Sequence, residues 1–293
     1  MVSLKDVKVK IGGVKKTKQI TKAMNMVASA KLRGAQQRIE RFRPYAQKFF
    51  DILSDLGGQS DEAAHPLLAV RDEVNTVGIV IATSDRGLCG SFNVNIINAA
   101  LKIAAEKAKE GKAVKFYCVG KKARDAVRKL EHDIPQAIVG QMNSFDFQLA
   151  VTVGQRIMDD FLSGKLDEVI MVYGEFVSLA KQAPVSLPIL PIASTGDKEE
   201  AKETATAKEY IYEPAVEGLL AELLPRFIKV QIYRGLLDTS ASEHAARMVA
   251  MDNATKNCDD MTAALTLLYN KTRQAAITKD LMDIVGGVEA LKG

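Results

Sequence analysis

Few residues in this 293-residue chain have the types and spacing that chemistry requires. The strongest candidate is Ser84-Asp85-Arg86-Gly87-Leu88-Cys89-Gly90, which follows a short apolar run at 77–82. A glycine-containing turn at the carboxyl end of a strand can hold an anion, and Arg86 could pair with it. The alternative is a tight strand-to-helix turn in which Asp85 and Arg86 are local partners. Cys89 could be acidified beside a helix N-terminus, but a small buried residue is the simpler interpretation, because no histidine lies near it in sequence.

Other chemical signatures are missing from the sequence. No GxxxxGK[ST] or GxGxxG motif is present, and the three histidines, His65, His132 and His244, are scattered. The three cysteines are far apart and form neither a metal-binding spacing nor a disulfide framework, which fits a reducing compartment. The sequence therefore predicts no catalytic residue, no metal site and no cofactor, and the chain does not look like an enzyme by itself.

Two long heptad patterns dominate the rest of the chain. From Leu4 to Leu56, sixteen positions spaced alternately three and four residues apart include thirteen apolar residues, with exceptions at Lys18, Thr21 and Asn25. This pattern predicts a coiled-coil helix about 80 Å long, which needs a partner of similar length. The polar break has two interpretations. Its residues fix the register of the coiled coil, or this level is left open for contact with another protein.

A second heptad pattern near the end of the chain supplies that partner. It runs from Val216 to Tyr269, then shifts by one residue near Arg273 and continues from Ile277 to Leu291. The predicted helix is about 110 Å long, so one of its ends should protrude beyond the shorter partner.

Between the two helices the period of the pattern changes. Strands are predicted at 77–82, 114–119, 137–139, 169–177 and 185–192, and helices at 93–109, 121–130 and 145–162. This alternation indicates an α/β unit with a mostly parallel sheet. The predicted fold class is an antiparallel two-helix coiled coil of the N- and C-terminal segments with an inserted Rossmann-like α/β domain. The expected domains are the N-terminal coiled-coil helix at 1–57, the inserted domain at 75–195 and the C-terminal coiled-coil helix at 210–293.

Charge is unevenly distributed along the chain. Residues 1–48 hold thirteen Lys or Arg and two acids, a net +11, whereas the whole chain carries +4, which leaves −7 for the remainder. A basic first helix favours an acidic partner or is simply a solvated face. Two other hypotheses stay open on the residues alone. One is a basic coiled coil that binds nucleic acid or acts as a scaffold, and the other is a nucleotide-binding enzyme that uses the α/β unit.

Two slender stretches, 23–31 and 242–257, are rich in Ala and Met and are flanked by cations. Small residues let another backbone approach closely, and Met adapts to changing neighbours. Ordinary coiled-coil packing accounts for about half of these residues. The alternative is a shaft that other subunits grip.

These stretches also carry a family resemblance. Residues 20–28, 84–90, 242–257 and 276–287 closely resemble the gamma subunit of F-type ATP synthase, and the match covers the whole chain in family order and spacing. The α/β unit lacks a Cys-containing regulatory insertion, so the sequence is similar to the bacterial form.

The resemblance implies a non-catalytic central-stalk rotor, present once per complex inside a ring of three alpha and three beta subunits. Its foot would rest on the c-ring beside epsilon, and c-ring rotation would drive sequential changes in the beta subunits, with ATP synthesis or, in reverse, hydrolysis. The basic helix would face an acidic lever of the beta subunits, and the apolar C-terminal end would seat in a hydrophobic sleeve. The resemblance implies a peripheral location at the cytoplasmic face of the bacterial inner membrane, held only through partners and without nucleic acid.

The resemblance also implies contact residues. Met24, Arg247, Arg273 and Gln274 match positions that contact the beta subunit. The positions that match the foot facing the c-ring are Arg41, Tyr210, Tyr212 and Glu213.

Overall fold

The computed structural model describes residues 3–57, 65–71, 73–192 and 216–292. Its elements are α1 (Leu4–Gly57), β1 (Thr76–Ala82), α2 (Phe92–Lys109), β2 (Ala113–Val119), α3 (Lys121–Lys129), β3 (Asp133–Ile138), α4 (Phe147–Leu162), β4 (Glu168–Phe176), β5 (Gln182–Leu190) and α5 (Val216–Lys292). The chain divides into two compact units, residues 1–29 with 247–293 and residues 30–246. This division cuts through both long helices, whereas the domains predicted from sequence kept each helix whole.

The heptad pattern of the first helix is confirmed. The Oγ of Ser3 accepts a hydrogen bond from the backbone N–H of Asp6 at 3.2 Å, so Ser3 caps the first turn. Pattern positions along α1 are buried, among them Val7, Ala28 and Ala35, while most positions between them are exposed. One apolar stripe therefore runs along α1 and is covered in both units.

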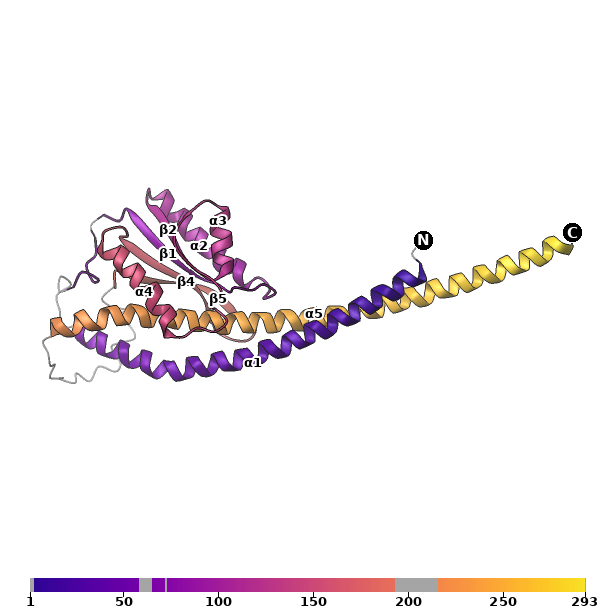
Figure 1. Ribbon diagram of the computed structural model, residues 1–293, viewed down its shortest axis with the longest axis horizontal. Coiled ribbons are helices and arrows are strands. Elements are labelled where there is room, and N and C mark those ends of the chain that lie inside the picture. The colour runs from indigo at the N-terminus through magenta and orange to yellow at the C-terminus, as the bar shows by residue number, and fades with distance from the viewer. Residues whose placement is uncertain (1–2, 58–64, 72, 193–215, 293) are drawn as a thin grey trace. The chain divides into compact units, whose positions relative to one another are not determined.

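In the unit formed by 1–29 and 247–293, the first half of α1 runs antiparallel to the last part of α5 (Figure 1). Met251 and Cys258 of α5 are buried, and Leu265 and Tyr269 are half-buried, as the heptad pattern predicts. The predicted shift of the pattern near Arg273 is wrong.

The half-buried positions beyond Tyr269 are Thr272 and Ala276, which continue the original spacing. Ile277, the first residue of the predicted shifted pattern, is 49% exposed. The apolar residues that follow it are exposed because, as Figure 1 shows, α5 extends past the start of α1.

In the unit formed by 30–246, five strands make one sheet in the order β3-β2-β1-β4-β5. The first four are parallel, and β5 runs antiparallel to β4 at the edge, where Pro184 and Pro188 lie. The predicted α/β architecture is confirmed, with corrections to two strands. β5 spans Gln182–Leu190 instead of 185–192. β3 begins at Asp133 instead of Ala137, because its pairing with β2 shifts register between Lys115 and Tyr117 and so breaks the alternation expected of a strand.

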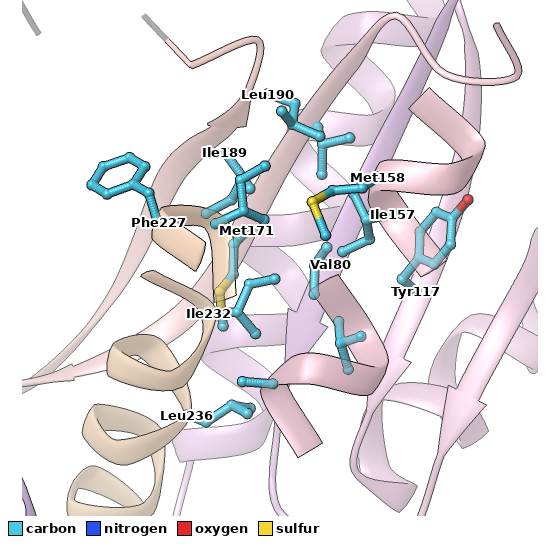
Figure 2. Packing of buried hydrophobic residues seen from close by; sticks show 14 of the residues in the cluster. Val80, Tyr117, Ile157, Met158, Met171, Ile189, Leu190, Phe227, Ile232 and Leu236 are labelled. Carbon is cyan, nitrogen blue, oxygen red and sulfur yellow. The ribbon is translucent and has the colours of Figure 1, made fainter. Parts of the chain in front are cut away.

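Two apolar cores lie on opposite faces of this sheet. Helices α2 and α3 cover one face, where Ile79, Phe92 and Phe116 are buried. Helix α4 and the first part of α5 cover the other face. Figure 2 shows Val80 and Met171 of the sheet with Ile157 of α4 and with Ile232 and Leu236 of α5.

Within this unit, the part of α5 from Leu236 to Ala245 is buried on nearly every side. Each residue from Leu236 to Ala245 is buried except Asp238, which is half-buried. The stretch includes hydroxyl-bearing and charged side chains, so polar groups there must find partners inside the protein.

Candidate functional site

The polar break of the first heptad pattern forms a layer of polar contacts inside the helix pair. Thr21 and Thr255 join their hydroxyl oxygens at 2.8 Å, and Asn25 Nδ2 donates to the carbonyl oxygen of Met248 at 2.8 Å. Lys18 Nζ forms an ion pair with Asp259. All three residues of the break therefore have partners on the opposite helix.

These contacts decide between the two interpretations of the break. Thr21 is only 9% exposed, so this level is not left open. Directional hydrogen bonds between two helices tolerate one register, whereas apolar contacts tolerate several. The polar layer fixes the register of the pair. Its net contribution to stability is small, about 1 kcal/mol for each hydrogen bond.

The partners on α5 could have been found only in part from the sequence. Thr255 occupies a position of the second heptad pattern, which marked it as inward-facing. Asp259 lies one residue after a pattern position, so the heptad pattern did not mark it as inward-facing. The long side chain of Lys18 nevertheless reaches it at the rim of the seam.

Apolar side chains are exposed around the polar layer. Met26 and Val27 on α1 are 58% and 57% exposed, and Val249 on α5 is 39% exposed. The slender stretch 23–31 and the part of the second stretch after Ala245 therefore bury one side and present apolar side chains on the other. Such surfaces are typical of contact with other proteins.

The outer face of the first turns of α1 is strongly basic. Its exposed cations are Lys5, Lys8, Lys10, Lys15, Lys16 and Lys22. Asp6 is the single acid of α1 before Glu40, so the positive charge is not neutralised within that stretch of the helix.

The last described turns of α5 carry an exposed apolar stripe. Leu281, Ile284 and Val285 are 57%, 63% and 60% exposed, and Val288 is 47% exposed. Every described side chain from Ile277 to Val288 is exposed. The stripe has the spacing of a buried helix face, but nothing in the described part of this unit covers it.

The residues implied by the family resemblance fall in different surroundings. Arg273 and Gln274 are exposed on α5, and Met24 is half-buried on α1. Arg247 is 9% exposed, so most of its side chain is covered within the chain. Arg41 is exposed on α1. Three further predicted foot residues lie outside the described residues: Tyr210, Tyr212 and Glu213.

The turn after β1 is held in place by hydrogen bonds between Asp85 and other segments of the chain. The carboxylate of Asp85 accepts hydrogen bonds from the backbone N–H groups of Lys121, Gly140 and Met142 at 2.9, 2.8 and 3.0 Å. These donors include the start of α3, where an anion would otherwise bind. The partners of Asp85 are therefore backbone groups of two distant segments and not the neighbouring Arg86, and its carboxylate occupies the place that a bound anion would take.

Two cysteines near this turn are buried. Cys89 is 2% exposed, which confirms the interpretation as a small buried residue. Burial raises the pKa of the Cys118 thiol to about 12, so this thiol is neutral at physiological pH. Among the described residues, no group of three or more His, Cys, Asp or Glu side chains could hold a metal ion.

The fold and these surfaces define a class of proteins in which two long helices pair and carry an α/β domain. The family model described as ATP synthase matches residues 3–291. The chain is 74% identical to the ATP synthase gamma chain of Nitratidesulfovibrio vulgaris strain Hildenborough over 293 residues, which covers both chains completely. It is 53% identical to the gamma chain of Lawsonia intracellularis, again over the full length of both.

Solved structures agree with this assignment. A chain of the central stalk and c-ring of the Tetrahymena thermophila mitochondrial ATP synthase matches with a TM-score of 0.60 and 26% identity, covering 80% of this chain and 99% of that one. A chain of the Euglena gracilis mitochondrial ATP synthase shares the fold, with a TM-score of 0.66 and 23% identity, covering 98% and 94%.

The chain belongs to the ATP synthase gamma-chain family. It is a non-catalytic subunit, the rotor of the central stalk, in a membrane-associated complex. No described helix is both long enough and apolar enough to cross a membrane.

Proposed function

We propose that this chain converts rotation of a c-ring into sequential conformational changes of catalytic beta subunits, and so drives ATP synthesis or, in reverse, hydrolysis. The observation that carries the proposal is the register-locked helix pair, whose polar layer is internal while apolar and basic side chains remain exposed around it. A shaft must not slip along its own axis, and it needs surfaces that other subunits can push against.

The partners in this proposal are the alpha and beta subunits as a hexameric ring, the epsilon subunit and the c-ring, with one copy of this chain per complex. The location is the cytoplasmic face of a bacterial plasma membrane, where the chain is held through these partners. Family membership and full-length identity to bacterial gamma chains support both statements.

The basic face of α1 suits a partner with an acidic surface. Six lysines between Lys5 and Lys22 are exposed, so a carboxylate-rich lever of a beta subunit would be attracted at long range and positioned along the helix. We assign this role to the acidic lever and not to nucleic acid, because the described chain places no exposed aromatic side chains among these lysines for stacking on bases.

The exposed stripe at the end of α5 suits an apolar sleeve. Ile277, Leu281, Ile284 and Val288 follow the spacing of one helix face, and all are about half exposed or more. Insertion of this end into a ring of apolar side chains would remove the stripe from water. Its contribution is to assembly, and rotation is transmitted elsewhere.

The coupling contacts in this proposal are Met24, Arg247, Arg273 and Gln274 toward the beta subunits. Met24 lies one residue before Asn25 of the polar layer, and Arg247 immediately precedes Met248, whose carbonyl accepts the Asn25 hydrogen bond. A contact at this level acts on the part of the shaft whose register is fixed. Arg41, Tyr210, Tyr212 and Glu213 are assigned to the foot that faces the c-ring.

Co-purification tests this function. The full chain, co-expressed with alpha and beta subunits of the same organism, should purify with one copy per hexamer. Membranes reconstituted with the complete complex should then pump protons on ATP addition. The proposal is wrong if the chain fails to bind the hexamer and instead binds DNA with a steep dependence on salt.

A further inference from the structure

Three residues of α5 face strand β4 at helical spacing. Gly235, Thr239 and Ser242 are separated by four and three positions, which places them on one side of the helix. A Cβ atom at Gly235 would lie 2.6 Å from Cε of Met171, so glycine lets the helix axis approach the strand closely. The two hydroxyl-bearing residues lie further along the same side and are completely buried.

Both hydroxyls bind the same residue of the strand. Ser242 Oγ donates to the carbonyl oxygen of Gly174 at 3.0 Å, and the backbone N–H of Gly174 donates to Thr239 Oγ1 at 3.4 Å. Helix α5 is therefore attached to both main-chain polar groups of one strand residue. Here two helix side chains satisfy the backbone N–H and C=O of a strand residue, which a neighbouring strand satisfies elsewhere in the sheet.

The position of Gly174 in the sheet explains why its backbone N–H and C=O groups are available to the helix. The pairing of β1 with β4 ends at Val172, so β4 has no strand neighbour on that side at Gly174. On the other side Gly174 lies opposite Pro184 of β5, which has no N–H to donate. In an antiparallel pair, a residue that does not exchange hydrogen bonds with its opposite residue points both groups away from it.

Gly174 is also fixed from the opposite face of the sheet. A Cβ atom there would lie 2.5 Å from Cε2 of Phe92, so the strand can press against the α2 side only as glycine. Gly174 is thus held between the ring of Phe92 and the two α5 hydroxyls. Apolar packing alone resists separation but is not directional, whereas hydrogen bonds to fixed main-chain atoms also resist sliding and rotation.

We propose that the contacts of Thr239 and Ser242 with Gly174 form a joint that transmits torque between the α/β domain and helix α5. Helix α5 is continuous from Val216 to Lys292, so a force applied to the sheet enters the shaft wherever the helix is attached to it. Thr239 and Ser242 are positioning residues, which act by holding the helix and touch no reacting group. The inference rests on the rotor function proposed above.

The test uses the complete complex reconstituted in vesicles, with the double variant Thr239→Val and Ser242→Ala. ATP hydrolysis should stay within about twofold of the wild type, because chemistry occurs in partner subunits, while protons pumped per ATP fall by about tenfold. Hydrogen exchange should show faster exchange at the Gly174 amide by about the same factor, since its acceptor is lost.

Three control variants separate the joint from general stability. Ser240→Ala removes a hydroxyl from the same helix that is 1% exposed and has no hydrogen-bond partner among the described residues, so coupling should not change. Val127→Ala opens a cavity in the other core, under α3, and should lower thermal stability without uncoupling. The single variant Thr239→Ser keeps a hydroxyl oxygen that can accept the hydrogen bond from the Gly174 N–H, so it should pump like the wild type.

The possible results are distinct. The joint is refuted if the double variant pumps like the wild type although exchange at Gly174 has risen, if exchange at Gly174 does not rise, or if Val127→Ala uncouples equally. If the wild-type chain itself supports no ATP-driven pumping in a complex that hydrolyses ATP, the proposed rotor function fails, whatever the variants do.

Discussion

One continuous helix, α5, is built in two different ways. In the unit formed by 30–246 it includes a surrounded stretch, where every residue from Leu236 to Ala245 except Asp238 is buried. In the unit formed by 1–29 and 247–293 it buries one seam, and residues such as Met261 and Leu267 on its other sides are 53% and 72% exposed. The first part anchors the helix, and the second leaves room for other proteins to reach it.

Anchoring and exposure need different interactions. The anchored part combines large apolar side chains with buried hydroxyls that bind main-chain groups, so it has one position against the sheet. The exposed part relies on a narrow seam and on the polar layer, which fixes register at a small cost in stability. Stability is therefore concentrated in the α/β domain, and the specificity of alignment lies in the helix pair.

Leu236→Ala should have the largest effect on stability. Leu236 is completely buried between α5 and the sheet, so truncation should cost about 2–5 kcal/mol. Leu265→Ala in the helix pair should cost about 1 kcal/mol, because Leu265 is only half-buried. Urea unfolding of the full chain measures both. Equal losses would contradict the contrast between the two regions.

Asp238→Asn should stabilise the anchored part at neutral pH. Burial, opposed by Arg234 and Arg43 and aided by Glu175, raises the pKa of Asp238 to about 6. Because the folded-state pKa lies above the ordinary value, ionisation of Asp238 lowers stability as pH rises from about 4 to about 6, and the cost persists above that range.

The stabilisation by Asp238→Asn should therefore be about 3 kcal/mol at about pH 7, by the usual conversion of pKa differences, and should disappear below about pH 4. Thermal melts of both chains across this range provide the measurement. A benefit that grows toward acid pH would show that Asp238 is stabilised, and not destabilised, by its surroundings.

Met24→Lys should act on coupling more than on folding. Met24 is half-buried beside the polar layer, and a lysine there brings a desolvated cation to the proposed contact with the beta subunit. We expect ATP-driven proton pumping to fall by about tenfold, equivalent to about 1.4 kcal/mol, with ATP hydrolysis retained. Met24→Leu, which conserves volume, should pump normally. Pumping by Met24→Lys at the wild-type ratio would remove Met24 from the coupling site.

Thr21→Val should have the smallest effect. The substitution removes one partner of the Thr21–Thr255 contact, but Thr255 Oγ1 keeps its hydrogen bond to the carbonyl oxygen of Met251 at 2.8 Å. The expected loss is about 0.5–1.5 kcal/mol in unfolding experiments. The control Thr17→Val alters an exposed residue that bonds only within its own helix, and it should be neutral. A loss above about 3 kcal/mol would mean that the polar layer holds the pair together and does more than fix its register.

Most of the fold could be predicted from sequence, because apolar periodicity extends over many residues. Both long helices and the strands of the sheet follow from it, but it did not show that the edge strand β5 runs antiparallel to β4. β3 was predicted too short, since a register shift broke its alternation. The seam after Tyr269 was misplaced, because Ile277, Leu281 and Ile284 have the spacing of a buried face although the described structure leaves them exposed.

The candidate site was less predictable. The sequence showed where the seam is polar but not which residues of the opposite helix those residues contact. That pairing depends on how the two helices are aligned, which neither heptad pattern fixes alone. The joint at Gly174 gave no sequence signal, because a serine, a threonine and a glycine are ordinary residues until the fold brings them together. Asp85 was identified as a turn residue, but its three backbone donors come from two distant segments.

Direct observation of rotation tests the central claim that this chain is a rotor. Cys89, Cys118 and Cys258 are buried, so Lys109→Cys at the exposed end of α2 provides a selective attachment point for a probe. With the alpha–beta hexamer fixed to a surface and ATP added, we predict continuous rotation of the probe in one direction at a rate that follows ATP turnover. ATP hydrolysis with a stationary probe would contradict it.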